Sequence, residues 1–308
     1  MPAAAQRAPA AAQEAAAGWA PAGVPLVLSQ RAAIDAALAR CVPEQDQHCL
    51  SDAAFSNLYL FRRPHAYRFH DGAFPYVSGL TYDGSAHALP LFAPAEAPPA
   101  VLQALLRAHG RLYPLSGGQL ARLDPVRFAW QAVRDDADYL YPADHFRHYR
   151  GTLLGKKRNL MRQLLSAHAV TARPYVPALA GAAMAVQVQW LRDKGKLAGE
   201  ADDEACAEAL RFVNALGLQG VLFEADGEPA GFVLAQHIRP GVYVMRFAKG
   251  LDRFKGIYQY MFHHFCSEAA PDAAWINFEQ DMGLDNFRRT KLSYQPAALL
   301  PKYRVTLR

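Results

Sequence analysis

The stretch that decides the fold is VLFEADGEPAGFVLAQHIRPGVYVMRFAKGLDRFKGIYQYM, residues 221–261. Its apolar runs at 221–225, 231–237 and 242–248 predict three antiparallel strands. Asp226-Gly227 is a strong signal for a two-residue hairpin turn between the first two strands. A loop at 249–256 then leads directly into a helix expected over residues 257–269. Three strands followed by a loop and a helix form the centre of an α/β unit.

The flanking segments extend this unit in both directions. An amphipathic pattern over 204–216 predicts a helix that ends at Gly217. Further strands are expected at 275–278 and 303–307, with a short helix near Leu284. Helices and strands also alternate between residues 32 and 141 and predict a first unit. We therefore expect an α/β (α+β) protein of two units, each a mixed, mainly antiparallel sheet flanked by helices.

Domain boundaries follow from composition. Residues 1–24 are rich in Ala and Pro and predict a disordered leader. The first unit is expected over 25–165 and the second over 166–308. With 308 residues, 52% hydrophobic and 20% charged, the chain is long enough to bury a sizeable core.

Positive charge is concentrated in two blocks, although the net charge is only +5 and the pI about 9.0. No Asp or Glu occurs between His145 and Arg192, and none occurs from Asn286 to Arg308. The first block contains Lys156, Lys157 and Arg158 at the start of a predicted amphipathic helix. These groups can bind phosphates or can simply form a solvated helix face.

The composition also limits location and chemistry. The four cysteines form no CxxC pair and match no zinc or disulfide spacing, so no metal is expected. No apolar run is long enough to cross a membrane. The leader has no compact apolar core of a secretory signal. These observations favour a cytoplasmic protein, and the sequence does not predict its oligomeric state.

The loop at 249–256 is a candidate anion site. A loop that enters a helix presents backbone N–H groups, and the helix dipole adds positive potential there. Arg253 and Lys255 add charge, and Gly256 permits close approach of a ligand. The alternative is an ordinary turn before a helix.

The segment NFEQDMG, residues 277–283, supplies candidate catalytic groups. Strand alternation would place Glu279 and Asp281 on one face, where two nearby carboxylates raise one pKa and suit a general base. Salt bridges to Arg288, Arg289 or Lys291 are the alternative. Tyr294 can donate a proton to a leaving oxygen or can be a buried structural residue. Arg288 and Lys291 can hold an anionic substrate.

Several segments, taken as an ordered set, resemble one known family. Arg253-x-x-Gly256-x-Tyr258 is similar to the pyrophosphate loop of the GNAT (acyl-CoA N-acyltransferase) fold. The ordered set resembles the phosphatidylglycerol lysyltransferase C-terminal domain family over residues 28–308. Its segments are FSNLY at 55–59, DYLY at 138–141, GKKRN at 155–159, GIYQ at 256–259, NFEQD at 277–281, KLSYQP at 291–296 and KY at 302–303.

This resemblance implies two tandem GNAT-like units and aminoacyl transfer from aminoacyl-tRNA to a lipid head group or another hydroxyl or amine acceptor. It requires no cofactor beyond the acyl donor. It also allows a peripheral location at the inner membrane surface, on anionic lipid. Two alternatives stay open: an N-acyltransferase that uses acetyl-CoA, and a non-catalytic protein that binds RNA or a membrane surface through its basic blocks.

Overall fold

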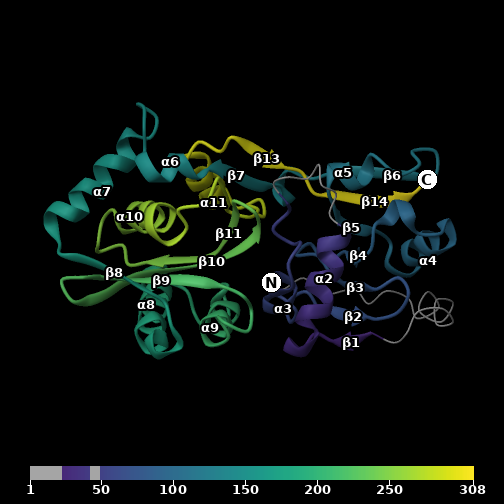
Figure 1. Ribbon diagram of the computed structural model, residues 1–308, viewed down its shortest axis with the longest axis horizontal. Helices are drawn as coiled ribbons and strands as arrows, with labels where there is room; N and C mark the ends of the chain where they lie inside the picture. The colour runs from purple at the N-terminus through teal and green to yellow at the C-terminus, as the bar shows by residue number, and fades with distance from the viewer. Residues whose placement is uncertain (1–22, 42–48) are drawn as a thin grey trace. The chain divides into compact units, whose positions relative to one another are not determined.

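The computed structural model describes residues 23–41 and 49–308, which form two compact units (Figure 1). The first unit runs to Ala137 and includes Leu300–Arg308, and the second is Asp138–Leu299. Most of the predicted leader lies outside the described residues. The expectation that it extends to residue 24 is wrong, because Val24 lies in strand β1 and pairs with Phe69.

The first unit contains a seven-stranded sheet in the order β1-β2-β3-β4-β5-β14-β6. Only β4 and β5 pair in parallel. The strands are β1 Val24–Pro25, β2 Arg68–His70, β3 Tyr76–Leu80, β4 Ala86–Pro90, β5 Leu112–Leu115, β6 Phe128–Ala132 and β14 Tyr303–Leu307. The helices are α2 Arg31–Cys41, α3 Phe55–Leu60, α4 Pro99–His109 and α5 Gly117–Leu120, with short 3-10 turns at Leu28–Gln30, Pro94–Glu96 and Arg134–Asp136.

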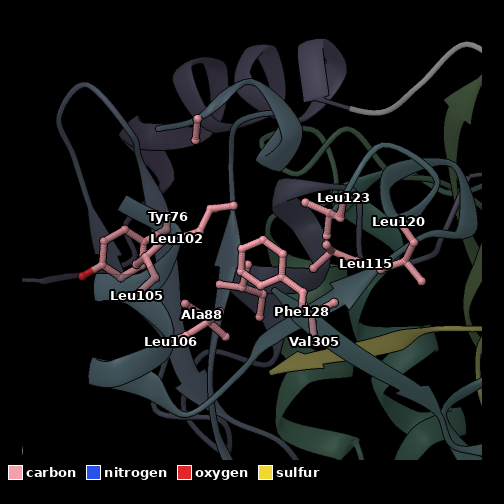
Figure 2. Packing of buried hydrophobic residues seen from close by; sticks show 12 residues of the cluster. Tyr76, Ala88, Leu102, Leu105, Leu106, Leu115, Leu120, Leu123, Phe128 and Val305 are labelled. Atoms are coloured by element: carbon pink, nitrogen blue, oxygen red, sulfur yellow. The ribbon is translucent and has the colours of Figure 1, made fainter. Parts of the chain in front are cut away.

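The core of the first unit forms where α4 packs on this sheet (Figure 2). Leu102, Leu105 and Leu106 recur at three- and four-residue helical spacing and are buried. They belong to the same apolar cluster as Leu112 of β5 and Val305 of β14. The last strand therefore completes the core of the first unit.

The second unit contains a seven-stranded sheet in the order β13-β7-β12-β11-β10-β9-β8. Its strands are β7 Asp138–Pro142, β8 Val170–Pro174, β9 Gln219–Ala225, β10 Glu228–Arg239, β11 Val242–Gly250, β12 Trp275–Asn277 and β13 Ala298–Leu300. Its helices are α6 Ala143–His148, α7 Gly155–Ala167, α8 Ala180–Asp193, α9 Asp203–Arg211, α10 Ile257–His264 and α11 Asp285–Leu292, with a 3-10 turn at Pro177–Leu179 and a π-helical turn at Phe265–Ala269.

Helices cover both faces of the second sheet. Helices α6, α7 and α10 lie on one face, and α8 and α9 lie on the other (Figure 1). The predicted hairpin turn is confirmed, because Asp226 and Gly227 join β9 and β10 with φ values of 53° and 82°. Two mixed, mainly antiparallel sheets with flanking helices confirm the predicted fold class.

The boundary between the units differs from the expected one at residue 165. Strand β7 pairs with β12, so the chain enters the second unit at Asp138. Strand β14 pairs with β5 and β6, so the chain returns to the first unit at Leu300. Sequence order alone assigned both strands to the wrong unit because sheet pairing is non-local. No helix in residues 23–41 and 49–308 is long and apolar enough to cross a membrane.

Candidate functional site

The candidate site lies where β11 and β12 stop pairing. The two strands pair in parallel only from Val242–Trp275 to Val244–Asn277. Strand β11 continues to Gly250, whereas the chain after Asn277 no longer pairs with β11. The segment that carries Glu279 and Asp281 begins at this divergence, so both carboxylates lie beyond the regular strand.

The backbone of Glu279 adopts a left-handed conformation, with φ of 58°. This conformation is uncommon for a residue other than glycine and must be held by its surroundings. The Glu279 N–H donates to Asn277 Oδ1 at 2.7 Å, and Asn277 Nδ2 donates to Asp138 Oδ2 at 3.0 Å. The Tyr139 N–H donates to the Glu279 carbonyl at 3.2 Å. The turn ends strand alternation at the first of the two carboxylates that the sequence offers as a general base.

A bulge in β11 places an arginine opposite this carboxylate. Consecutive residues Leu234 and Ala235 of β10 pair with Phe247 and Met245, which leaves Arg246 as the extra residue. A bulge redirects the side chain of the extra residue. The Arg246 side chain is 0% exposed. The signal in the sequence that could have identified Arg246 is that it is a single arginine within an otherwise apolar strand.

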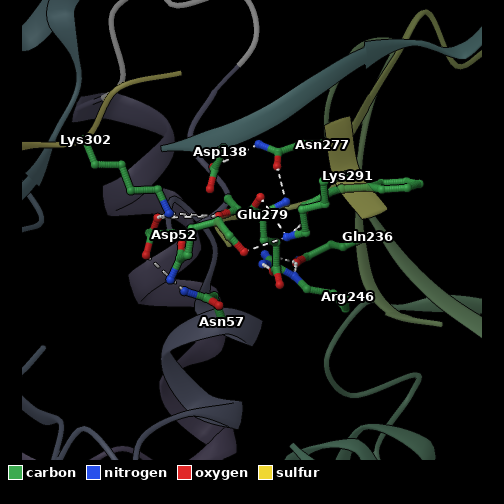
Figure 3. A network of polar contacts seen from close by, with 12 residues as sticks. Asp52, Asn57, Asp138, Gln236, Arg246, Asn277, Glu279, Lys291 and Lys302 are labelled. Carbon is green, nitrogen blue, oxygen red and sulfur yellow. Dashed lines mark hydrogen bonds and ion pairs between the residues drawn. The ribbon is translucent and has the colours of Figure 1, made fainter. Parts of the chain in front are cut away.

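Arg246 joins Glu279 to a glutamine (Figure 3). Its Nη1 donates to Glu279 Oε1 at 2.6 Å. Its Nη2 and Nε donate to Gln236 Oε1 at 2.9 and 3.3 Å. The Glu279 side chain remains 21% exposed, so it is anchored on one side and open on the other. Sequence reasoning missed both Arg246 and Gln236.

Burial raises the pKa of the Glu279 carboxyl, while the nearby Arg246 guanidinium opposes that shift. Asp138 raises the pKa further and Lys291 lowers it, and the net result is a raised pKa. A carboxylate with a raised pKa is better matched to proton transfer near neutral pH than an ordinary one. Of the two predicted carboxylates, Glu279 is therefore the one whose pKa is shifted in the direction that a general base requires.

Asp281 occupies a different environment and is fully buried. Its Oδ2 accepts from the Tyr139 hydroxyl at 2.5 Å and from Arg288 Nε at 2.9 Å, and its Oδ1 accepts from Arg288 Nη2 at 3.1 Å. Burial tends to raise the pKa of Asp281, but these hydrogen bonds outweigh it and hold the pKa well below its usual range. The expected shared face with Glu279 is wrong, because the left-handed turn separates the two environments.

Lys291 holds the same segment from the C-terminal part of α11. Its Nζ donates to the carbonyl oxygens of Phe278, Glu279 and Gln280 at 2.6, 3.1 and 2.5 Å. Three consecutive carbonyls converge on one ammonium group. Lys291 and Arg288 were both predicted to bind an anionic substrate. In the structure Lys291 binds these carbonyls and Arg288 pairs with Asp281, so both cations stabilise the conformation of this segment.

Tyr294 lies in an aromatic cluster and is 3% exposed. Its ring lies within 5.6 Å, centroid to centroid, of both Phe146 and Phe262. Its hydroxyl accepts from Gln259 Nε2 at 2.7 Å, and burial raises its pKa. This environment favours the structural alternative over a role as proton donor.

The basic cluster at the start of α7 divides by environment. Lys157 Nζ donates to Ser293 Oγ at 2.7 Å and lies 3.9 Å from the Tyr294 ring centroid. Burial, with a smaller contribution from Lys156, lowers the Lys157 pKa. Arg158 Nη1 donates to the Tyr149 carbonyl at 2.5 Å. Two of the three cations therefore fix α7, and Lys156 is exposed.

Lys156 and Lys255 line one open groove of about 660 Å³. The two lysines come from separate predicted motifs, the basic helix and the anion loop. A second groove of about 570 Å³ continues along the outer side of α7. The remaining residues of the first groove are Thr152, Gly155, Asn159, Leu160 and Gln163, and the second is lined by Asn159, Arg162, Gln163, Ser166 and Ala167.

Helix α7 also explains Gly256. This residue has φ of 100°, and a Cβ on it would lie 2.1 Å from the Leu160 carbonyl oxygen. The glycine therefore admits the backbone of α7, whereas the sequence predicted that it admits a ligand. Arg253 lies at the surface and pairs with Glu228 at 2.7 Å. Of the predicted loop cations, only Lys255 lines the groove.

Tyr258 turns its hydroxyl towards the end of β11. The hydroxyl accepts from Trp190 Nε1 at 2.9 Å, and a Cβ on Gly250 would lie 3.3 Å from the Tyr258 ring. The Tyr258 ring therefore covers the backbone of Gly250 at this strand end.

Comparisons with known proteins agree with this architecture. The family described as phosphatidylglycerol lysyltransferase, C-terminal, matches residues 47–306. No curated protein matches the sequence.

Several solved structures are similar in fold, and they include the following three. A conserved protein of unknown function from Bacteroides thetaiotaomicron is 22% identical with a TM-score of 0.78, over 93% of this chain and 99% of that one. The C-terminal domain of a putative lysylphosphatidylglycerol synthetase from Agrobacterium fabrum is 13% identical with a TM-score of 0.59, over 91% and 92%. A tandem GNAT protein from the clavulanic acid biosynthesis pathway is 10% identical with a TM-score of 0.51, over 92% and 97%. The predicted tandem GNAT-like fold is confirmed.

Proposed function

The chain belongs to the phosphatidylglycerol lysyltransferase C-terminal family of acyltransferases, and we propose that it moves an aminoacyl group from aminoacyl-tRNA to a hydroxyl or amine acceptor. The hydroxyl of a phosphatidylglycerol-type lipid is one such acceptor. The observation that carries this proposal is the outer side of α7, which offers hydrogen-bond donors and positive charge without any acid.

The outer side of α7 has the composition of a phosphate-binding surface. Its residues lie at three- and four-residue spacing and line the two grooves. Lys, Arg, Asn, Gln and Ser side chains all donate to phosphate oxygens in nucleic-acid complexes. Lys255 adds a further positive charge from the loop before α10. The residues that provide the donors are Lys156, Asn159, Arg162, Gln163 and Ser166.

The surroundings of α10 favour an aminoacyl ester over coenzyme A as the donor. The backbone of α7 occupies the space beside Gly256, where the resemblance to GNAT proteins would put a pyrophosphate. The Tyr258 ring lies against Gly250 at the end of β11. A polynucleotide whose phosphates spread along α7 avoids both obstacles, whereas a compact pyrophosphate meets both.

Glu279 is the candidate general base for the transfer. The acceptor oxygen or nitrogen attacks the ester carbonyl, a new acyl bond forms and the ester bond to the tRNA ribose breaks. Glu279 takes the proton of the acceptor and passes it to the ribose oxygen as the ester bond breaks, which releases the tRNA hydroxyl and restores the carboxylate. The reaction requires no covalent enzyme intermediate, and catalysis rests on positioning and electrostatics. The proposed location is the cytoplasm, with peripheral binding at the inner membrane surface when the acceptor is a lipid.

The test follows labelled amino acids from a mixed aminoacyl-tRNA pool into lipid and small-amine extracts. We expect the wild-type protein to transfer label, and the double variant Lys156→Glu/Lys255→Glu to lose most of the transfer. Arg192→Glu/Lys196→Glu is the matched control, since it makes the same charge change outside α7 and its grooves. Transfer from acetyl-CoA alone would support the N-acyltransferase alternative. Binding of tRNA or anionic vesicles without turnover of any donor would support the non-catalytic one.

A further inference from the structure

Glu279 is held unevenly by its neighbours. Its backbone N–H and carbonyl both have partners in the second unit, and its Oε1 accepts from Arg246. Among the residues that the structure describes, none donates a hydrogen bond to its Oε2. One carboxylate oxygen is therefore fixed and the other is available.

We propose that Arg246 and Gln236 are positioning residues that hold Glu279 Oε1, so that Oε2 is presented to the proton of the acceptor. The inference rests on the proposed function for the identity of the reacting partner. It goes beyond that function because it assigns a role to two residues behind the base, neither of which need contact a substrate.

The geometry of the guanidinium supports this role. Burying an arginine is costly unless its donors find partners, and the planar guanidinium has donors at fixed angles. Gln236 Oε1 accepts from Nε and Nη2 on one edge, which directs Nη1 towards Glu279 (Figure 3). The β11 bulge provides the backbone position from which Arg246 reaches both partners. The glutamine therefore sets the orientation of the arginine, and the arginine sets that of the carboxylate.

Three charged groups of the second unit face Glu279 from three elements. Arg246 faces it from β11, Asp138 from β7 and Lys291 from α11. The substitution Gln236→Glu places a second carboxylate on Arg246 without altering any of these groups. The guanidinium is then shared between two anions, its hold on Glu279 weakens, and proton loss from Glu279 becomes harder.

The test measures Glu279 itself by NMR of protein labelled with ¹³C at the glutamate side-chain carboxyl, with Glu279→Gln to assign its signal. We expect Gln236→Glu to raise the pH at which Glu279 titrates. A rise of one unit would lower the ionised fraction on the acidic side about tenfold. The acid limb of the kcat profile should move in the same direction, while KM for the donor stays constant.

Two further variants complete the design. Arg246→Lys keeps the positive charge but loses the planar donor set, so we expect kcat to fall at least tenfold. Gln236→Asn retains an acceptor and should recover part of the activity that Gln236→Leu loses. Gln131→Glu makes the same charge change on an exposed strand of the first unit and should alter neither titration nor turnover.

An unchanged Glu279 titration in folded Gln236→Glu, together with wild-type kcat in Arg246→Lys, would overturn the inference. Because the NMR titration needs no substrate, it separates this inference from the proposed function. If no aminoacyl donor is turned over, the proposed function fails even when the Glu279 titration moves as expected.

Discussion

The carbonyl oxygen of Leu160 in α7 lies 2.1 Å from the position that a Cβ on Gly256 would occupy. The glycine also has φ of 100°, which disfavours any side chain. The contact joins the basic helix to the loop that carries Lys255, so one glycine keeps both sides of the first groove together.

We therefore predict that Gly256→Ala lowers the free energy of unfolding by about 2–4 kcal/mol, from strain and overpacking together. Urea unfolding measures the change. Gly195→Ala is the control, because Gly195 also has a positive φ of 62° but has open space around it. Gly195→Ala should lower the free energy of unfolding by about 1 kcal/mol, from the positive φ alone, because no neighbouring atom meets its Cβ. Equal losses in both variants would mean that α7 moves away easily.

The ion pair between the buried Asp281 carboxylate and the partly exposed Arg288 guanidinium predicts a pH dependence of stability. The folded-state pKa of Asp281 lies below its unfolded value, so its stabilisation is present above the unfolded pKa of about 3.9 and is lost as pH falls through the folded value. Asp281→Asn should lose about 3 kcal/mol at pH 7 and show a flatter acid limb. The exposed Asp285→Asn serves as the control, and equal acid sensitivity of Asp281→Asn and wild type would contradict the prediction.

The Lys291 ammonium predicts a variant with a local structural defect. Lys291→Met removes the donor to three carbonyls, so we expect a loss of about 2–3 kcal/mol and faster hydrogen exchange of the amides in residues 278–281. Arg289→Met removes a cation from the exposed side of the same helix. If the two variants exchange at the same rate, Lys291 does not hold the segment.

The environment of Tyr294 predicts that its hydroxyl is dispensable for chemistry. Tyr294→Phe keeps the aromatic packing and removes the hydroxyl that accepts from Gln259. We expect about 1 kcal/mol of lost stability and turnover within about twofold of wild type. A fall in kcat of a hundredfold or more with intact stability would instead restore Tyr294 as the proton donor.

The groove along α7 predicts a salt-dependent interaction. Lys156→Gln and Lys255→Gln should each weaken binding of tRNA and reduce the slope of log affinity against log salt concentration by about 1. Filter binding across a salt series measures the slopes. Arg253→Gln is the control, because Arg253 pairs with Glu228 outside the groove. Unchanged slopes in both lysine variants would place RNA binding elsewhere.

Local sequence signals predicted much of the second unit. The Asp226-Gly227 turn and the apolar runs around it led to the correct hairpin, since turn chemistry and strand patterning act over short distances. The site was harder to predict because its geometry depends on two interruptions of strand order. The left-handed turn at Glu279 separated it from Asp281, and the bulge at Arg246 brought an unpredicted cation opposite.

Contacts between distant segments account for the remaining differences. The sequence predicted that Gly256 gives room to a ligand, but in the structure it gives room to α7. This contact could not be predicted because α7 begins about a hundred residues earlier in the chain. Four of the cations predicted to bind a ligand have partners within the protein instead, because tertiary packing places acceptors beside them. They are Lys157, Arg158, Arg288 and Lys291. Sequence shows which residues are cations, whereas only the fold shows which of them stay available.

The position of β14 between β5 and β6 has a consequence for folding during synthesis. A ribosome completes every residue of the second unit before it reaches Tyr303. The second unit is continuous in sequence and can fold as its residues emerge from the ribosome. The sheet of the first unit cannot be completed until β14 has been synthesised, because β14 pairs with both β5 and β6. The portion of the chain made first is therefore the portion finished last, and a ribosome stalled before Tyr303 would leave the first unit open.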